Sequence, residues 1–245
     1  MPHDKFAQSR SSARDSSTAG LTAFVIVGGD PLPPPVVAAV TARCGLGETV
    51  MIAADSGLDH ALTAGFRPDI VVGDFDSVSV AALHWARTND IDIDEHPPAK
   101  DDTDTELALA TAISRGATDI VMISGGGDRL DHSIGALTAL GHPSLARLRS
   151  VSALWSDSTI HVLHGPRSLE IELPTGTTFS LLALHGRCTG VGEVGAQWPL
   201  DDAVIEPASS RGISNVSIAE TVTVSVATGI ITIIVPAHTV LAGQS

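Results

Sequence analysis

Two aspartates one residue apart, Asp74 and Asp76, directly follow a short apolar run at 70–72. If this run is a buried parallel strand, both carboxylates lie just past its carboxyl end, where open α/β sheets bind their ligands. Carboxylates crowded in one place repel each other unless a cation joins them. Mg²⁺ prefers such oxygen ligands and usually carries phosphate groups of its own. The sequence therefore predicts a magnesium-dependent enzyme that acts on phosphates.

Other acidic residues occupy similar places along the chain. Asp55 and Asp131 lie at or soon after the ends of other predicted strands, and Asp104 opens a predicted helix. Because the carboxyl ends of parallel strands share one edge of a sheet, we expect these side chains to converge. An isolated Asp of this kind is more often a helix cap or turn residue, so the prediction depends on several converging. His132 is either a general base or a cap of the next helix.

The best candidates for phosphate binding are a glycine turn and two cations. Gly125, Gly126 and Gly127 follow a predicted strand, and their amides can face phosphate oxygens. Lys100 and Arg129 are each embedded in an acidic motif, where phosphate binding competes with a structural salt bridge as the explanation. The chain contains neither GxxxxGK[ST] nor a proper GxGxxG, which excludes a P-loop and an ordinary dinucleotide fingerprint.

One tryptophan differs from the other two. Trp85 has the spacing of a helix packing residue and Trp155 ends a strand, so both are predicted to be core residues. Trp198 is in a loop with Gly and Pro neighbours, where it could be a stacking platform for a flat ligand or a structural residue. Ser214 and Asn215, in another loop, offer hydroxyl and amide groups to the same pocket.

Alternating strands and helices must position the acidic cluster. Up to about residue 155, short apolar runs alternate with helical segments, which predicts a doubly wound, mostly parallel sheet. Beyond about residue 158, short β-rich segments punctuated by Gly and Pro predict a small antiparallel sandwich or barrel. We therefore expect a disordered tail at 1–20, an α/β domain at 21–157 and a β-sandwich domain at 158–245.

Composition excludes several classes of protein. The net charge of -14 argues against nucleic acid or an anionic membrane surface as a partner. Cys44 and Cys188 are far apart without CxxC spacing, so they are interpreted as small core residues and not as a disulfide or zinc site. No signal peptide opens the chain, and its apolar runs are far shorter than the roughly 20 residues that cross a bilayer. We expect a soluble, cytoplasmic protein.

Taken in order, these pieces resemble the motifs of the thiamine pyrophosphokinase family, whose members move the diphosphate of ATP onto thiamine. The family's runs are DGG, PDxxxGDFDS, KDxTD, GGRxDH, GxxxSLxxL, GxxWxL and SN. Their counterparts are at 55–57, 68–77, 100–104, 127–132, 176–184, 195–200 and 214–215. The resemblance covers the chain from about Val25 to the C-terminus.

The resemblance implies a role for each motif and a homodimer, in which thiamine lies between the α/β domain of one subunit and the β domain of the other. It implies Mg²⁺ held by Asp74, Asp76 and Asp104. It implies an ATP and diphosphate site completed by Asp55, Arg129 and Asp131, with Lys100, Asp101, Gly126, Gly127 and His132 on the nucleotide side. Trp198 would stack on thiamine, while Ser214 and Asn215 line its pocket.

Three residues depart from the family pattern. Ser56 and Asp128 replace glycines, and Ala136 stands where Asn often follows the DH pair. The first two add bulk or charge near the phosphates, which bears on nucleotide affinity or choice, but none removes a predicted metal ligand. Two alternatives stay open: a pyrophosphokinase for another heterocyclic alcohol, such as a hydroxymethylpterin, and a non-catalytic sensor of thiamine or nucleotide.

Overall fold

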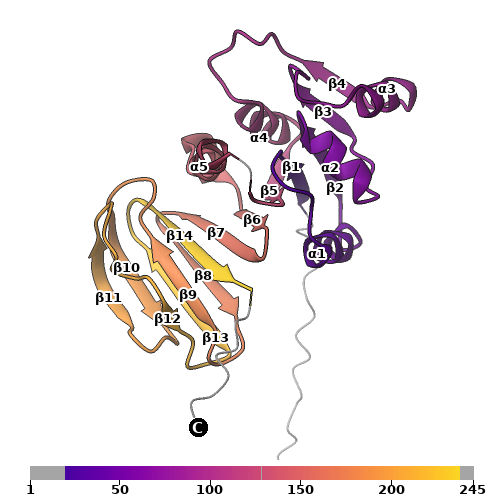
Figure 1. Ribbon diagram of the computed structural model, residues 1–245. Coiled ribbons are helices and arrows are strands. Elements are labelled where there is room, and N and C mark those ends of the chain that lie inside the picture. Colours follow the sequence, from indigo (N-terminus) through magenta and orange to yellow (C-terminus); the bar gives the residue numbers. More distant parts are fainter. Residues whose placement is uncertain (1–19, 128, 238–245) are drawn as a thin grey trace, which may run out of the picture.

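The computed structural model describes residues 20–127 and 129–237. The predicted tail falls almost wholly outside these residues, as does Asp128. Figure 1 shows two parts, one with helices around a sheet and one built of strands. The predicted fold class, a mostly parallel α/β part followed by a small β sandwich, is confirmed. No helix among the described residues has both the length and the apolar character needed to span a membrane.

Six parallel strands form the sheet of the first part, in the order β6-β5-β1-β2-β3-β4. They are β1 (Leu21–Ile26), β2 (Thr49–Ala54), β3 (Ile70–Gly73), β4 (Asp92–Glu95), β5 (Ala117–Ser124) and β6 (Ser150–Trp155). All of β3 is buried. A strand covered on both faces is a continuous apolar run, which is why the run at 70–72 could be recognised from the sequence.

Helices cover both faces of this sheet. They are α1 (Pro34–Cys44), α2 (Gly57–Thr63), α3 (Val80–Thr88), α4 (Asp104–Ser114) and α5 (Leu130–Ala139), with a short 3₁₀ helix η2 (Pro143–Arg147). Small residues of α4 and α5 pack on one face of the sheet, whereas α1, α2 and α3 pack on the other. The partly buried Trp85 and Trp155 pack against these cores, and both cysteines are free.

Local sequence sets where the helices that flank the site begin. Thr103 and Glu106 form a capping box at the start of α4: the Glu106 carboxylate accepts from the Thr103 amide at 2.8 Å, and the Thr103 hydroxyl accepts from the Glu106 amide. Ser79 caps α3 with its side chain alone, which accepts a hydrogen bond from the amide of Ala82. The capping box fixes Asp104 as the first residue of α4, at the edge where the strands end.

The two parts share one sheet, which the sequence pattern did not indicate. A tight hairpin turns β6 into β7 (Ser158–His164), which pairs antiparallel with it. The sheet continues through β14 (Ile230–Pro236), β9 (Thr178–Leu182) and β12 (Asn215–Val216) to ten strands. A second sheet of β11 (Leu200–Ile205), β10 (Cys188–Val194), β13 (Thr221–Val226) and β8 (Arg167–Glu172) completes the sandwich around its own apolar core.

Candidate active site

Three of the predicted aspartates meet at the carboxyl edge of the parallel sheet. Asp55 follows β2, and Asp74 and Asp76 follow the neighbouring strand β3. One carboxylate oxygen from each lies within 4.8 Å of the other two. The expected convergence of residues far apart in the sequence is therefore present in the structure.

The backbone beyond β3 makes this convergence possible. Phe75 is buried in the apolar core beneath α2 and α3, so the residues on either side of it turn away from that core. Both Phe75 and Asp55 have positive φ, of 62° and 47°. Gly73, with φ of 149°, admits no side chain easily, because an added Cβ would lie 3.1 Å from an oxygen of Asp104. The glycine thus lets Asp104 approach the cluster.

A lysine neutralises the side of the cluster next to α4. The Lys100 Nζ lies 2.5 Å from Asp104 Oδ1 and 3.4 Å from Asp74 Oδ2. Burial lowers the pKa of Lys100, but these two carboxylates outweigh that effect and raise it. Asp104, predicted as a metal ligand, is thus paired with Lys100. The closely spaced carboxylate group consists of Asp74 and Asp76 with Asp55 as its third member. Asp101 is exposed beside Lys100.

The Asp55 carboxylate has the properties of a metal ligand. Burial raises its pKa, the Ser56 amide counters part of the shift, and the charges of Asp104, Asp76 and Asp74 raise it further. Its Oδ1 is buried and has no hydrogen-bond partner among the described residues. A buried carboxylate oxygen without a donor, surrounded by other carboxylates, suits a hard divalent cation such as Mg²⁺. The residues present therefore fit the metal that the sequence predicts.

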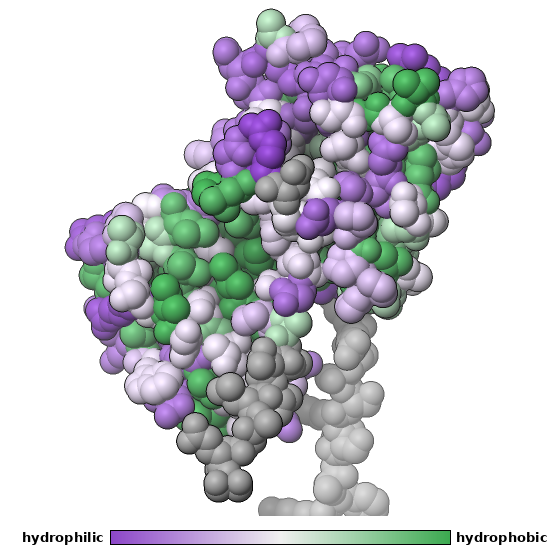
Figure 2. All heavy atoms as spheres, in the orientation of Figure 1, coloured by the Kyte–Doolittle hydropathy of each residue, from purple (hydrophilic) through white to green (hydrophobic). Residues whose placement is uncertain are grey.

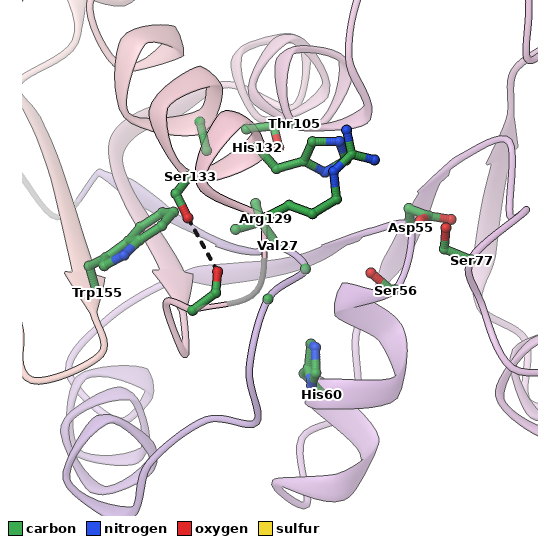
Figure 3. Close-up of a pocket in the computed structure, with 14 residues that line it drawn as sticks. Val27, Asp55, Ser56, His60, Ser77, Thr105, Arg129, His132, Ser133 and Trp155 are labelled. Carbon is green, nitrogen blue, oxygen red and sulfur yellow. Dashed lines mark hydrogen bonds between the residues drawn. The ribbon is translucent and has the colours of Figure 1, made fainter.

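A cavity of about 390 Å³ opens beside this cluster, shown in Figure 3. Asp55, Ser56, Gly127, Arg129 and His132 line it, together with residues of the β1–α1 turn and of α5. A neighbouring cavity of about 270 Å³ shares Asp55 and His132 with the first and is also lined by Asp104 and Asp131. The two cavities together bring the metal candidates and the phosphate candidates to one place.

Arg129 forms a salt bridge and also borders the cavity where a phosphate group could bind. It lines the larger cavity, and its guanidinium also binds Asp131, with Nη2 2.5 Å from Oδ2. The hydrogen bond from Arg129 lowers the pKa of Asp131 to about 2. Both side chains are more than half exposed. An exposed pair of this kind contributes little to stability and leaves the guanidinium able to meet a phosphate.

The glycine turn has the backbone shape needed at a phosphate site. Gly126 and Gly127 have φ of 74° and 68°, a region that favours glycine. The Gly126 carbonyl accepts a 2.7 Å hydrogen bond from the amide of Asp30. A Cβ on Gly127 would lie 1.8 Å from an Asp30 carboxylate oxygen. Asp30 was not predicted for the site, although its position after Gly28 and Gly29 at the end of a strand was a signal.

The departures from the family pattern are accommodated where the structure describes them. The Ser56 hydroxyl lies 2.6 Å from where a Cβ of Gly28 would be, so the added bulk of Ser56 fits because residue 28 is glycine. Ala136 is buried and lines both cavities. Asp128 lies outside the described residues.

The predicted stacking residue lies in the β part. Trp198, between β10 and β11, is 58% exposed, and Ser214 is exposed with φ of 62°. Asn215 is buried and its polar atoms all have protein partners. Its Oδ1 accepts from the amides of Trp198 (3.1 Å) and Val216 (2.9 Å), and its Nδ2 donates to the Trp198 carbonyl (2.8 Å) and to Glu193 Oε1 (2.9 Å). Asn215 therefore holds the Trp198 loop in place.

The two groups of site residues are far apart within one chain. In the ten-stranded sheet, β12, which carries Asn215, is the first strand and β3, which leads to Asp74, is the ninth. Eight spacings of about 4.8 Å separate the two strands by roughly 38 Å along the sheet. A single chain does not bring Trp198 to the carboxylate cluster.

Comparisons with known proteins agree on one family. A model described as "Thiamin pyrophosphokinase, catalytic domain" matches residues 46–151, and one described as "Thiamin pyrophosphokinase, vitamin B1 binding domain" matches residues 159–231. A search of curated protein sequences gives no significant match.

Solved structures with the same fold include proteins named as thiamine pyrophosphokinases from three organisms. That of Bacillus subtilis has a TM-score of 0.74 at 24% identity, covering 89% of this chain and 99% of its own. That of Geobacillus thermodenitrificans has a TM-score of 0.73 at 25% identity, covering 90% and 99%. That of Candida albicans has a TM-score of 0.69 at 14% identity, covering 88% and 90%.

Proposed function

Since the chain belongs to the thiamine pyrophosphokinase family, we propose that it transfers the diphosphate of ATP to the hydroxyl of thiamine, giving thiamine diphosphate and AMP. The observation that carries this proposal is the group formed by Asp55, Asp74 and Asp76 beside the cavity lined by Arg129. A diphosphate transfer needs positioning and charge neutralisation more than a strong base, and these residues supply both.

Each part of the site has a role in this reaction. Asp55, Asp74 and Asp76 would hold Mg²⁺, with Asp104 beside them; when bound, Mg²⁺ supplies positive charge at the phosphate oxygens. Lys100 and Arg129 hold the phosphates and neutralise negative charge as the bond to AMP breaks. The amide of Gly127, which lines the cavity, can face phosphate oxygens, whereas the amide of the buried Gly126 donates to Ser124 Oγ at 3.1 Å. His132 borders the same cavity. The thiamine hydroxyl attacks the β-phosphorus in line, and AMP leaves.

The β part provides the thiamine side of the site in this proposal. A flat ring stacks on the exposed face of Trp198, and the exposed Ser214 offers a hydroxyl next to it. Asn215 fixes the backbone that carries the indole.

We also propose that the active form is a homodimer in which each site takes its carboxylates from one chain and its Trp198 from the other. The separation of about 38 Å along the sheet supports this, because one chain leaves the two halves apart. Large apolar side chains near Trp198 or near Ser214 in the sequence are exposed as well: Val194 (67%), Ile213 (49%) and Ile218 (60%). Figure 2 shows apolar residues gathered on the face of the β part in view. Such a surface is typical of a protein interface.

The test is to incubate the purified protein with ATP, Mg²⁺ and thiamine and to measure AMP and thiamine diphosphate. We expect one AMP for each thiamine diphosphate formed, and no product from the Asp76→Asn variant. Thiamine binding without AMP would support the sensor. Turnover with a hydroxymethylpterin in place of thiamine would support the other pyrophosphokinase. Either result would refute the proposed substrate or reaction.

A further inference from the structure

A buried carboxylate lies directly behind the Trp198 loop. Glu193, on β10, has no exposed surface. It shares the inward face of the strand with Val191, and it is in register with Leu200 of β11 and Val224 of β13. A charged residue at an inward position of a β sandwich is rare, because burying a charge without a partner costs several kcal/mol. Its place in this core therefore needs an explanation.

The only hydrogen bond that the Glu193 side chain makes within the described residues is to Asn215, the side chain that holds Trp198. Its Oε1 accepts from Asn215 Nδ2 at 2.9 Å, whereas its Oε2 is buried without a partner. The same Asn215 nitrogen also donates to the Trp198 carbonyl, and Asn215 Oδ1 accepts from the Trp198 amide. A chain of hydrogen bonds thus connects the carboxylate to both backbone groups of the exposed indole residue.

Among the residues that the structure describes, no positive charge compensates this carboxylate. Of the neighbouring strands, β9, β12 and β13 carry no titratable side chain, and the Asp201 and Asp202 side chains of β11 are exposed. Burial raises the pKa of Glu193 to about 7, and the hydrogen bond from Asn215 offsets part of that shift. Near neutral pH the group is therefore divided between its neutral and ionised forms.

We propose that Glu193 is a positioning and specificity residue, which holds the Trp198 loop through Asn215 and, when ionised, favours a cationic ring on the indole. This rests on the proposed function, because thiamine carries a permanent positive charge on its thiazolium ring. A buried carboxylate without a counter-ion acts through a low dielectric, so its charge is felt farther than it would be in water. A cation on Trp198 supplies the missing opposite charge and in turn favours the ionised form of Glu193.

Linkage between the two charges gives a measurable pH dependence. A ligand that prefers the ionised form lowers the pKa of Glu193 when it binds, so binding releases protons and tightens as the pH rises through about 7. If thiamine binds the protein with ionised Glu193 about fivefold more tightly than the protein with neutral Glu193, the affinity for thiamine should rise about threefold between pH 6 and pH 8. About a third of a proton should be released per site at pH 7.

Both the affinity for thiamine and the number of protons released can be measured by calorimetry of thiamine binding to the full-length protein. The titrations are made at several pH values, in two buffers of different ionisation enthalpy. Glu193→Gln keeps the size of the side chain and an acceptor for Asn215, and should lose both the pH dependence and the proton release. Glu172→Gln is the matched control, since it removes one negative charge from an exposed position on β8 and should retain both. A thiamine analogue with an uncharged thiophene in place of the thiazolium should bind the unmodified protein without either effect.

The outcomes separate this proposal from the function on which it rests. Thiamine binding that releases no protons, a pH dependence that persists in Glu193→Gln, or an equal dependence with the uncharged analogue would overturn it. If Glu193→Gln fails to fold, the two ligands compared on the unmodified protein still decide. Thiamine diphosphate formation with pH-independent binding would refute only the role of Glu193, whereas absence of thiamine binding at every pH would refute both proposals.

Discussion

Replacing Asp76 by Asn should raise the stability of the metal-free protein while removing the stabilisation by Mg²⁺. Asp76 is the best carboxylate for this test, because it is exposed and, within the described part of the chain, its Oδ1 accepts only from the hydroxyl of its neighbour Ser77. Asp74, by contrast, also binds Lys100. The substitution therefore removes a charge and leaves the other contacts of the cluster in place.

The expected size follows from the spacing of the carboxylates. Two unit charges 4.8 Å apart repel by about 1 kcal/mol in water and by about 3 kcal/mol at the effective dielectric near a protein surface. Water screens the exposed Asp76, so a gain of about 1 to 2 kcal/mol is expected. For a chain of this length, that is an increase in Tm of roughly 2 to 8 °C. Saturating Mg²⁺, at about 100 times its Kd, should stabilise the unmodified protein by about 2.7 kcal/mol.

Thermal unfolding with and without Mg²⁺, at constant ionic strength, measures both effects, and Asp102→Asn serves as the control. Asp102 is exposed and lies outside the closely spaced carboxylate group, so its substitution should change neither the metal-free Tm nor the response to Mg²⁺. The reasoning would be refuted if Asp76→Asn lowered the metal-free Tm and kept the full response to Mg²⁺. Turnover should be nearly abolished by the same substitution.

Three further outcomes are expected. Trp198→Ala should weaken thiamine binding by about 1 to 3 kcal/mol, seen chiefly in the thiamine KM, with little change for ATP; equal weakening for both would indicate a structural Trp. Mixing Asp76→Asn protein with Trp198→Ala, Ser214→Ala protein should restore roughly a quarter of full activity at thiamine concentrations well below the KM, since half of the dimers are mixed and each has one intact site; proven subunit exchange without recovery would mean that one chain builds each site. Burial, with a smaller effect of Arg43, lowers the pKa of His161 to about 4. The unfolded chain then binds more protons, so stability should fall from about pH 6.5 to pH 4, less steeply in His161→Gln if denaturation curves measure it.

The carboxylate half of the site was predictable because buried parallel strands have a simple signature. The apolar run of β3 ends in glycine and then in two aspartates, and parallel topology alone brings Asp55 to the same edge. What the sequence could not provide is the pairing within the cluster. Lys100, in the loop before α4, contacts Asp74 as well as Asp104, and no spacing rule predicts its contact with Asp74, 26 residues away in the sequence.

The β part was harder to predict because its strands are irregular and polar. The strands β10 and β11 were not predicted: one contains two glycines and a glutamate, and the other begins with Leu200, Asp201 and Asp202. Val191 and Glu193, two positions apart on β10, nevertheless both face inward. Their spacing was therefore a sequence signal that the Glu193 side chain is buried. Asn215 was predicted to line the pocket, whereas the structure shows it bound to the backbone of Trp198.

The continuous sheet bears on how a complete site can form. A hinge between the two parts of one chain would have to open the ladder between β6 and β7, where four residue pairs from Ser152 to Trp155 are in register with Ser158 to His161. Each backbone hydrogen bond contributes about 0.5 to 1.5 kcal/mol, and the apolar core on the α4 side also extends from β6 onto β7. Closing the roughly 38 Å between Asn215 and Asp74 by bending is therefore costly. A second subunit needs no such bending, because a two-fold axis can place the β part of one rigid chain against the carboxylates of the other.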